Sequence, residues 1–342
     1  MRPCPPPEFL GERSVWQKTG GNADRQGLFS AADEIQGVDN TMSRWAVAIH
    51  GGAGVVAGRS YAKAEGYLSL QVCAAATALD TGSAALDVVQ AAVEAMEASG
   101  LFVAGRGSVP GRLGQIELDA CIMDGRTGRA GAVAALQGYP APVAVARRVM
   151  EASQAVLLVS EGAASFAASQ GFDRIPGPLA TWLRKPDGFD LTDLDDGHGT
   201  VGAVALDRKG RLAAATSTGG VYGALQGRVG DTPVPGAGVW ADSNVAVSCT
   251  GQGEAFLRVA AAHDLAARMR YQGAECIKAA DEVLAAVEQA GGDGGLIAVT
   301  REGKVVAPFN TDGMKRAWAT SDGEAWVGSV GTTLRALRTA AG

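Results

Sequence analysis

A threonine that directly follows a glycine, at Gly199-Thr200, stands where a polar loop runs into an apolar strand. If the chain is cut between these two residues, Thr200 carries a free α-amine beside its hydroxyl. An α-amine has an unperturbed pKa of about 7.7 to 8.0, so it can accept the hydroxyl proton near neutral pH. One residue would then supply both a nucleophile and its base, an arrangement that can open amide bonds.

Such a cut needs a strained backbone, because an ordinary peptide bond is inert. Glycine adopts unusual φ and ψ values at low steric cost, which suits the position before the threonine. Attack of the Thr200 hydroxyl on the Gly199 carbonyl would give an ester that water can open. The sequence therefore predicts self-cleavage at Gly199-Thr200. This chemistry requires no histidine, and the chain has only three.

The residues after Thr200 predict a β-hairpin. Two apolar runs, Val201–Asp207 and Leu212–Thr218, flank a polar turn centred on Lys209. Residues equidistant from Lys209 face each other, so Thr218 lies opposite Thr200. Opposed residues of an antiparallel pair lie about 4.5 to 5.5 Å apart, within reach of a side-chain hydroxyl. Paired β-branched residues are also ordinary sheet composition, so the hairpin by itself leaves a catalytic and a structural role for Thr218 open.

The composition is that of a globular protein. The chain has 342 residues, of which 47% are hydrophobic and 19% charged, enough for a large core in one or two domains. The 48 glycines fall singly or in pairs between apolar runs, which indicates tight turns and a site built from loops. The formal net charge of −6 gives no electrostatic footprint for nucleic acid or an anionic membrane. We therefore expect small molecules or a second copy as partners.

The cysteines and the N-terminus indicate a cytoplasmic protein. The five cysteines are odd in number and widely spaced, without a CxxC pair, so we expect reduced thiols. No run approaches the roughly 18 apolar residues that a membrane span needs. Residues 1–42 are rich in Pro, Gly, Asp and Gln without periodicity, which predicts a disordered extension rather than a signal peptide. Residues 43–342 are predicted to form a single catalytic domain.

Helices in pairs are predicted between pairs of strands, beginning with a strand at Trp45–Ile49. The expected helices, the second with Ser83 as N-cap, span Tyr61–Leu79, Ala84–Ala98, Pro140–Val149, Glu254–Arg270 and Gly273–Gln289. The other expected strand pairs are Ile116–Met123 with Ala130–Ala135, and a final pair at Gly295–Val299 and Val305–Pro308. This order favours antiparallel sheets layered between helices over a parallel βαβ sheet. The polar, Asp-rich segment Gly177–Gly197 predicts a mobile loop that leads to Thr200.

Five stretches, in a fixed order, resemble the plant-type asparaginase and isoaspartyl aminopeptidase family of N-terminal-nucleophile hydrolases. They are His50–Gly54, Gly199–Asp207, Ala215–Gly220, Gly227–Asp231 and Ser248–Glu254. The similarity runs from about Trp45 to the C-terminus. It implies an α+β fold, a four-layer αββα sandwich with mainly antiparallel sheets. It also implies self-cleavage into an α chain that ends at Gly199 and a β chain of residues 200–342, with two αβ units pairing into a heterotetramer.

The resemblance assigns the chemistry to two groups of residues. Thr200 would be nucleophile and base, and Thr218 would orient its amine. Thr250 and Gly251 would form the oxyanion hole, through a hydroxyl and a backbone N–H. Considered alone, this second pair would more often be the end of a strand that turns into a helix.

The resemblance also implies a clamp for the head of a free amino acid. Arg228 would fork onto an α-carboxylate and Asp231 would bind the α-ammonium, with Gly253 beside them. Without the resemblance, Arg228 and Asp231 would be an ordinary i,i+3 surface pair. The implied substrate is L-asparagine or a β-linked aspartyl dipeptide, hydrolysed to L-aspartate without a cofactor for the chemistry. Glycosylasparaginase and threonine aspartase share the nucleophile, and a binding protein that never matures could share the scaffold.

The chain departs from the family pattern at Val103, where members usually have asparagine, and at Gly100, which replaces a common proline. We expect the loss of a polar contact at Val103 to slow self-cleavage or alter substrate choice. The same loop resembles one that holds a structural sodium ion by backbone carbonyls. The implied ligands are the carbonyls of Met96, Glu97, Ser99, Phe102, Ala104 and Arg106.

Overall fold

The computed structural model describes residues 44–177, 182–183 and 199–337, all of which belong to one compact unit. The extension predicted at residues 1–42 lies outside the described residues. So does most of the loop predicted at Gly177–Gly197.

Within the described residues, the larger sheet has nine strands in the order β13-β12-β11-β1-β5-β6-β2-β3-β4. Its centre is formed by β1 (Ala46–His50), β5 (Val201–Leu206), β6 (Leu212–Thr218), β2 (Leu118–Asp124) and β3 (Arg129–Leu136). Its edges are formed by β4 (Leu157–Val159) on one side and by β11 (Gly313–Thr320), β12 (Ala325–Val330) and β13 (Arg335–Ala336) on the other. All these neighbours pair antiparallel except β3 and β4.

The smaller sheet has four strands among the described residues, in the order β10-β9-β8-β7. They are β7 (Val239–Ala241), β8 (Val245–Gly251), β9 (Gly294–Thr300) and β10 (Val305–Val306), all antiparallel. The described helices are α1 (Ala62–Asp80), α2 (Ala85–Ser99), α3 (Pro142–Ala152), α4 (Ser160–Ser169), α6 (Gly253–Val259), α7 (Ala261–Gln272) and α8 (Cys276–Gln289). A 3₁₀ turn spans Gly105–Gly107.

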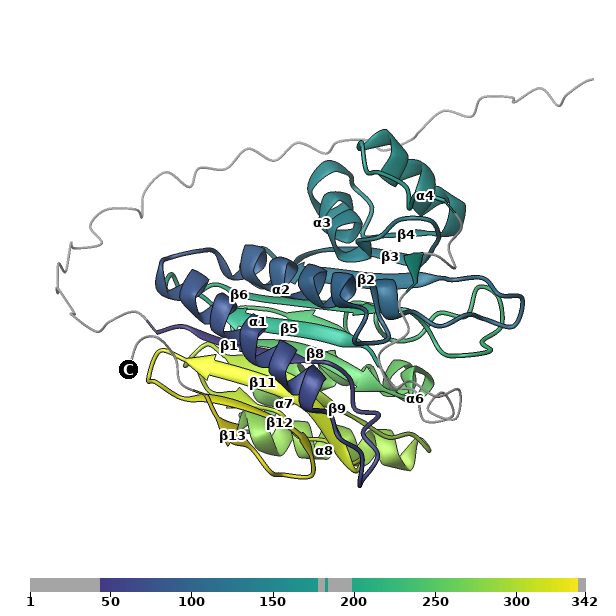
Figure 1. Ribbon diagram of the computed structural model, residues 1–342. Helices are drawn as coiled ribbons and strands as arrows, with labels where there is room; N and C mark the ends of the chain where they lie inside the picture. The colour runs from purple at the N-terminus through teal and green to yellow at the C-terminus, as the bar shows by residue number, and fades with distance from the viewer. Residues whose placement is uncertain (1–43, 178–181, 184–198, 338–342) are drawn as a thin grey trace, which may run out of the picture. The chain divides into compact units, whose positions relative to one another are not determined.

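Three hydrophobic cores separate four layers. The first lies between α1, α2 and α3 and the larger sheet. The second lies between the two sheets, where β1, β5 and β6 pack on β8 and β9. The third lies between the smaller sheet and α7 and α8. This αββα order, visible in Figure 1, confirms the predicted sandwich of mainly antiparallel sheets.

Most elements predicted from periodicity are present, and three predictions are wrong. Ser83 does not cap α2: the N-cap is Ala84, and the Ala85 N–H donates instead to the Asp207 carboxylate at 3.0 Å. The helix expected at Glu254–Arg270 is interrupted at Ala260, which has a φ of 50°. The strand pair ending at Pro308 is not the last, because β11, β12 and β13 follow. The strand order also places β11 beside β1, a pairing between opposite ends of the described chain.

Candidate active site

Thr200 lies directly before β5, a central strand of the larger sheet, and is 7% exposed. The β5–β6 ladder pairs Val201 with Ser217 and Gly202 with Thr216. The next position of this register places Thr200 opposite Thr218, the last residue of β6. The hairpin predicted around Lys209 is therefore confirmed.

A pocket with an empty volume of about 290 Å³ opens at this end of the sheet. It is lined by Gly199, Thr200, Thr218, Gly220, Val221, Arg228, Gly230, Asp231, Thr232, Gly251 and Gly253. The structure thus gathers into one cavity nearly every residue that the sequence assigned to cleavage, catalysis or substrate binding. Thr250 is the exception. Its side chain is fully buried, and its Oγ1 accepts the Ala53 N–H at 3.4 Å.

Asp231 has a buried carboxylate with one unsatisfied hydrogen-bond acceptor. It is 4% exposed, and its Oδ2 has no hydrogen-bond partner among the described residues. Burial raises the pKa of Asp231 to about 7, although backbone N–H groups and the Arg228 cation act to lower it. A buried carboxylate oxygen without a donor is costly unless a cation or donor arrives. The unpartnered oxygen of Asp231 can therefore bind a positively charged group of a ligand in the pocket.

Arg228 does not form the i,i+3 pair with Asp231 that its spacing allowed. Its Nε and Nη2 donate instead to the two carboxylate oxygens of Glu254, at 2.9 and 2.8 Å. The Arg228 side chain is 19% exposed, whereas the Glu254 side chain is 63% exposed. Arg228 and Asp231 consequently present a cation and an anion to the same cavity, separately held.

Glycines keep these charged groups uncovered. A Cβ at Gly253 would lie 2.9 Å from Asp231 Oδ1, and one at Gly230 would lie 3.0 Å from Arg228 Nη1. Gly251 has a φ of +155°, and a Cβ there would lie 2.3 Å from the Asp293 carbonyl oxygen. These residues must lack side chains for the backbone and the charges to reach a ligand closely.

Asp119 belongs to the site but was missed from the sequence. It lies on β2 opposite Thr218 in the β2–β6 ladder and is 2% exposed. Its Oδ1 accepts the Ala135 N–H at 2.8 Å. Burial raises the pKa of Asp119 to about 7, while the nearby Arg228 cation lowers it. The available signal was a single carboxylate inside an otherwise apolar strand.

Val103 packs directly on the bond before Thr200. A Cβ at Gly199 would lie 2.3 Å from Val103 Cβ and Cγ2, so only glycine fits there beside the valine. The Val103 carbonyl accepts the Gly219 N–H at 2.8 Å and the Thr218 hydroxyl at 3.5 Å. The side chain of Val103 thus packs beside the Gly199–Thr200 bond, and its backbone carbonyl holds Thr218.

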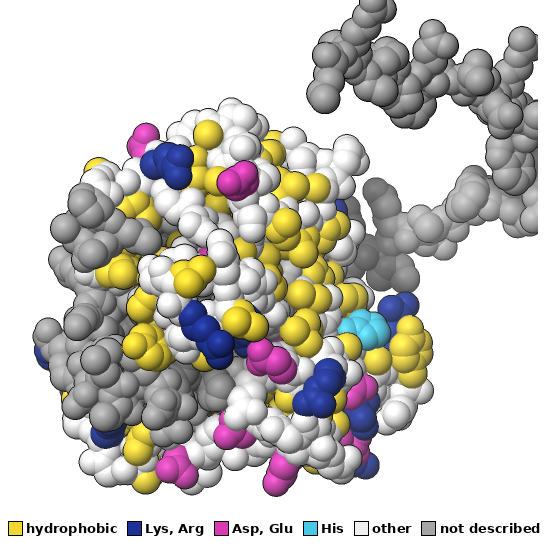
Figure 2. All heavy atoms as spheres, turned by 90° about the vertical axis from the view of Figure 1, so that its right-hand side faces the viewer, with side chains coloured by type: hydrophobic (Ala, Val, Ile, Leu, Met, Phe, Trp, Pro, Cys, Tyr) yellow, Lys and Arg dark blue, Asp and Glu magenta, His cyan; other side chains and the backbone are white. Residues whose placement is uncertain are grey.

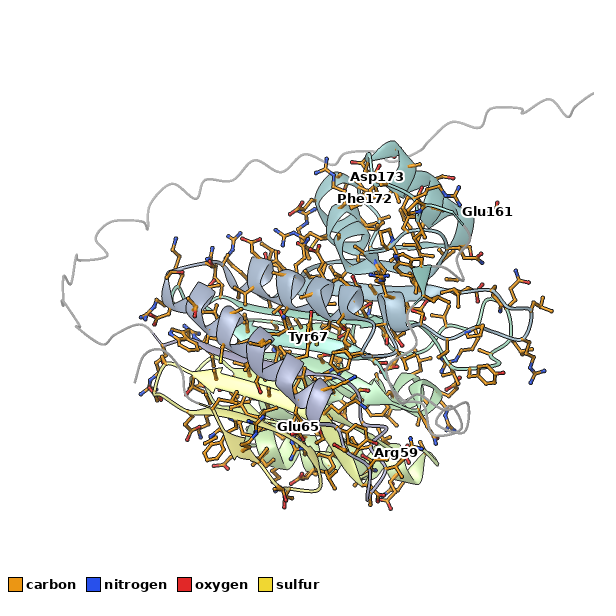
Figure 3. All side chains as sticks on the ribbon, viewed as in Figure 1. Arg59, Glu65, Tyr67, Glu161, Phe172 and Asp173 are labelled. Carbon is orange, nitrogen blue, oxygen red and sulfur yellow. The ribbon has the colours of Figure 1, made fainter. Side chains whose placement is uncertain are left out.

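The loop that carries Val103 is itself held by aromatic packing. Tyr67 projects from α1 (Figure 3), and its ring centroid lies 6.2 Å from that of Phe102. The Tyr67 hydroxyl donates to the Ala95 carbonyl at 2.7 Å. The Phe102 ring in turn occupies the space that a side chain at Gly51 would need. Helix α1 and the loop after β1 therefore fix the loop that places Val103 beside Gly199.

His50 is buried close to Thr200 but is unsuited to act as a base. Its Nε2 lies 2.8 Å from Ser248 Oγ, which lies 2.8 Å from Thr216 Oγ1. Burial lowers the pKa of His50 to about 3, so the imidazole is neutral at physiological pH and is a weak proton acceptor. Gly202 leaves room for this chain of hydrogen bonds, since a Cβ there would lie 2.0 Å from Ser248 Oγ.

The described residues show no group of three or more His, Cys, Asp or Glu side chains that could hold a metal ion. None of the described helices is long and apolar enough to span a membrane. The cysteines that the structure describes, Cys73, Cys121, Cys249 and Cys276, are all free thiols. On the face shown in Figure 2, basic and acidic side chains are interspersed rather than gathered into a basic patch.

A four-layer αββα sandwich, with a threonine at the start of a central strand and a polar pocket above it, defines the class of N-terminal-nucleophile hydrolases. Within this class the chain belongs to the asparaginase family. The family model described as "Asparaginase" matches residues 43–185 and 180–329. The resemblance inferred from the five sequence stretches is thereby confirmed, and the chain is a hydrolase.

Curated relatives cover most of the chain. An "Isoaspartyl peptidase" of Salmonella typhimurium is 47% identical over 299 residues, which span 81% of this chain and 96% of that protein. An "Isoaspartyl peptidase" of Escherichia coli is 45% identical, covering 81% of this chain and 93% of the relative. A "Plant-type L-asparaginase" of Pyrobaculum calidifontis is 43% identical, covering 68% and 83% respectively.

Proposed function

We propose that this chain cleaves itself before Thr200 and then hydrolyses the side-chain amide of L-asparagine or the β-linked bond of isoaspartyl dipeptides, releasing L-aspartate. One observation carries the proposal: Thr200 and the separately held Arg228 and Asp231 line the same small pocket. The curated relatives named isoaspartyl peptidase and L-asparaginase support the same substrates.

Maturation begins with attack of the Thr200 hydroxyl on the Gly199 carbonyl carbon. The C–N bond then breaks and an ester links Gly199 to the threonine oxygen. Water opens the ester, leaving a carboxylate on the α chain and a free α-amine on Thr200. The packing of Val103 against Gly199 supports this step, because it restricts the carbonyl to a narrow range of positions.

The clamp then decides which amide reaches the nucleophile. Arg228 binds the α-carboxylate with its fork of N–H donors, and the open oxygen of Asp231 binds the α-ammonium. With the amino acid head fixed in this way, the side-chain carbonyl lies over Thr200. The pairing of Arg228 with Asp231 in one pocket supports a small, free-headed substrate over the protein substrates of a threonine aspartase or the glycan-bearing substrates of a glycosylasparaginase.

Hydrolysis proceeds through an acyl-enzyme. The Thr200 amine takes the hydroxyl proton as the oxygen attacks the side-chain carbonyl, and Thr218 orients that amine from the opposite strand. The Gly251 N–H and the Thr250 hydroxyl stabilise the oxyanion. Collapse expels ammonia, or the amine of the leaving residue, with the proton returned by the threonine amine. Water then attacks the ester and releases L-aspartate.

Blocked substrates test the clamp directly. We expect the kcat/KM for ammonia release from L-asparagine to be at least about tenfold higher than from N-acetyl-L-asparagine or L-asparagine amide, since each blocked compound loses one charge-assisted contact. The first lacks the ammonium that Asp231 binds, and the second lacks the carboxylate that Arg228 binds. Equal turnover of all three compounds would contradict the proposed function.

The pKa of Asp231 predicts a pH dependence of binding. Substrate ammonium needs the ionised carboxylate, whose pKa in the free enzyme is raised to about 7, so affinity is lost as the pH falls through 7. The inhibition constant of L-aspartate should rise about tenfold for each pH unit below that pKa, because one proton must be released on binding. Arg228 keeps its charge over this range, whereas Asp119 also titrates near 7.

Two controls isolate the ammonium contact in this titration. Succinate lacks the amine, so its inhibition constant should not rise as steeply below pH 7. An Asp231→Asn variant should bind L-aspartate weakly, with the steep dependence removed. Parallel pH profiles for L-aspartate and succinate would show that Asp231 is not the titrating partner.

Replacing Val103 by asparagine, the usual family residue, should change the rate of self-cleavage. Val103→Asn places an amide beside Gly199, where its N–H can polarise the carbonyl of the scissile bond. We therefore expect self-cleavage to become at least about threefold faster, which is the effect of one neutral hydrogen bond. The measurement is the fraction of uncut chain over time on a denaturing gel. Val103→Thr is the control, because it keeps the branched shape. If Val103→Asn alters neither processing nor kinetics, the valine has no such role.

A sodium ion is proposed as a structural partner of the loop after α2. The carbonyls of the last helical turn lack intrahelical donors and carry the negative end of the helix dipole. A Cβ at Gly107 would meet the carbonyl oxygens of both Phe102 and Gly100, which shows that carbonyls converge in this loop. The proposed ligands are the carbonyls of Met96, Glu97, Ser99, Phe102, Ala104 and Arg106. A monovalent ion there would hold the loop shape without taking part in acyl transfer.

We further propose a dimer of αβ units in the cytoplasm. The free thiols of the described cysteines support a reducing compartment. The formal net charge of −6 supports small-molecule rather than nucleic acid partners. Sedimentation of the processed protein measures the assembly.

A further inference from the structure

Arg228 has five N–H donors, and Glu254 occupies only one edge of them. The Nε and one Nη2 hydrogen face the Glu254 carboxylate, at 2.9 and 2.8 Å. This side-on pairing leaves both hydrogens of Nη1 and the second hydrogen of Nη2. A second carboxylate can therefore bind the same guanidinium end-on, without displacing Glu254.

The free edge of the guanidinium faces the pocket. Gly230 lines the pocket, and a Cβ there would lie 3.0 Å from Nη1 and 3.3 Å from Nη2 of Arg228. The absence of a side chain at Gly230 therefore leaves this end of the fork uncovered. The other edge is held by Glu254, whose side chain is exposed and is not among the residues that line the pocket. The Nε/Nη2 edge of Arg228 thus binds Glu254, and the Nη1/Nη2 edge is left for a ligand in the pocket.

Glu254 also connects the clamp to the oxyanion hole. It lies in the first turn of α6, three residues after Gly251 at the end of β8. That junction is fixed by the Gln252 N–H, which donates to the Asp293 carbonyl at 2.9 Å. A guanidinium held by Glu254 is therefore held relative to the backbone that carries the oxyanion donor.

A long arginine side chain at a pocket mouth has many rotamers, and fixing them before the ligand arrives removes an entropic penalty from binding. Without the carboxylate of Glu254, the Arg228 guanidinium could rotate out of the pocket into solvent. The bidentate geometry matters because two parallel N–H···O bonds set both position and plane.

We propose that Glu254 is a positioning residue for substrate recognition: it orients Arg228 so that the Nη1/Nη2 edge receives the α-carboxylate of the substrate. The inference rests on the proposed function, since it assigns a substrate contact to Arg228. Glu254 itself touches neither the reacting carbonyl nor Thr200. Its effect is on the substrate's head group and therefore on KM rather than on kcat.

The test compares two amides in wild type, Glu254→Gln and Glu254→Ala. For L-asparagine, we expect KM to rise about tenfold or more in Glu254→Ala, the size of a lost charge-assisted hydrogen-bond pair, with a smaller rise in Glu254→Gln. The kcat should stay within about twofold, because uniform binding is what has been lost. For 3-aminopropanamide, which lacks the α-carboxylate, the kcat/KM values of wild type and both variants should agree.

A matched control removes a similar ion pair away from the pocket. Arg268 of α7 pairs with Glu282 of α8 at 2.5 Å, and the Glu282 side chain is 37% exposed. Glu282→Gln should leave the kinetics of both amides unchanged. Complete self-cleavage of the Glu254 variants on a denaturing gel shows that they fold, as expected for a change at an exposed side chain.

Three results overturn the inference. An unchanged or lower KM for L-asparagine in Glu254→Ala would show that Glu254 does not position Arg228, or that it competes with substrate. An equal loss with 3-aminopropanamide would show a general disturbance of the pocket. If wild type hydrolyses neither amide, the proposed function fails and the inference fails with it. Activity in wild type with either of the first two results would overturn the role of Glu254 alone.

Discussion

Replacing Thr200 by alanine is expected to leave the protein as a single 34.7 kDa chain and to abolish hydrolysis. The methyl group of alanine can neither attack the Gly199 carbonyl nor be deprotonated by an α-amine, so both the cut and the later reaction are lost. Since nucleophile and base disappear together, the rate of ammonia release should fall by at least about 10⁴-fold. Mass spectrometry of the denatured protein and an ammonia assay measure the two effects.

Thr200→Ser is the matched control. Serine keeps a hydroxyl and, after cleavage, an α-amine, so this variant should still process and turn over, with lower rates. The substituted residue is 7% exposed, so the small change in volume should leave the fold intact. A wild-type chain that stays whole after long incubation would favour the binding protein that never matures. A Thr200→Ala chain that still splits at Gly199 would refute the mechanism.

Thr250→Val is expected to reduce kcat by about 10²- to 10³-fold, which corresponds to about 2.7 to 4 kcal/mol of lost oxyanion stabilisation. Valine has nearly the shape of threonine, so the fully buried site keeps its packing. The KM for L-asparagine should change little, because Thr250 is assigned to the oxyanion, while Arg228 and Asp231 still hold the head group. Steady-state kinetics at saturating L-asparagine measure the effect.

The control for Thr250 separates catalysis from structure. Thr250 Oγ1 also accepts the Ala53 N–H at 3.4 Å, so valine removes that weak contact as well. Thr250→Ser keeps the hydroxyl and should retain most of the activity. A fall in kcat that Thr250→Ser shares in full would assign the effect to packing. An unchanged kcat in Thr250→Val would remove its hydroxyl from the oxyanion hole.

Local patterns predicted most of the fold. The spacing of apolar residues located α1, α2 and α8 to within a few residues, and the turn at Lys209 fixed the β5–β6 register because a hairpin is a short-range element. The break at Ala260 was missed since no glycine or proline marks it; the left-handed conformation comes from an alanine. Among the strands missed after Pro308, β11 pairs with the distant β1, whereas β12 and β13 pair with their neighbours in sequence.

The amino-acid sequence alone indicates which residue can act as nucleophile and which residue faces it, since Gly199, Thr200 and Thr218 depend on one bond and one hairpin. What surrounds these residues depends on contacts between distant segments of the folded chain. The partner of Arg228 is Glu254, from a helix that begins after another strand, and not Asp231 three residues away. Asp119 enters the site through the β2–β6 ladder.

Glu254 and Asp119 both come close to Arg228 through tertiary packing, which the spacing of residues along the chain does not determine. Spacing along the chain limits which side chains can meet, but burial and charge decide which of them do. In the folded protein, loss of water raises the pKa of Asp231 and leaves one of its oxygens without a partner, while Arg228 finds a carboxylate at the surface. The sequence thus specifies the residues that we propose to react, and the packing of distant segments around them creates the pocket that we propose to select the substrate.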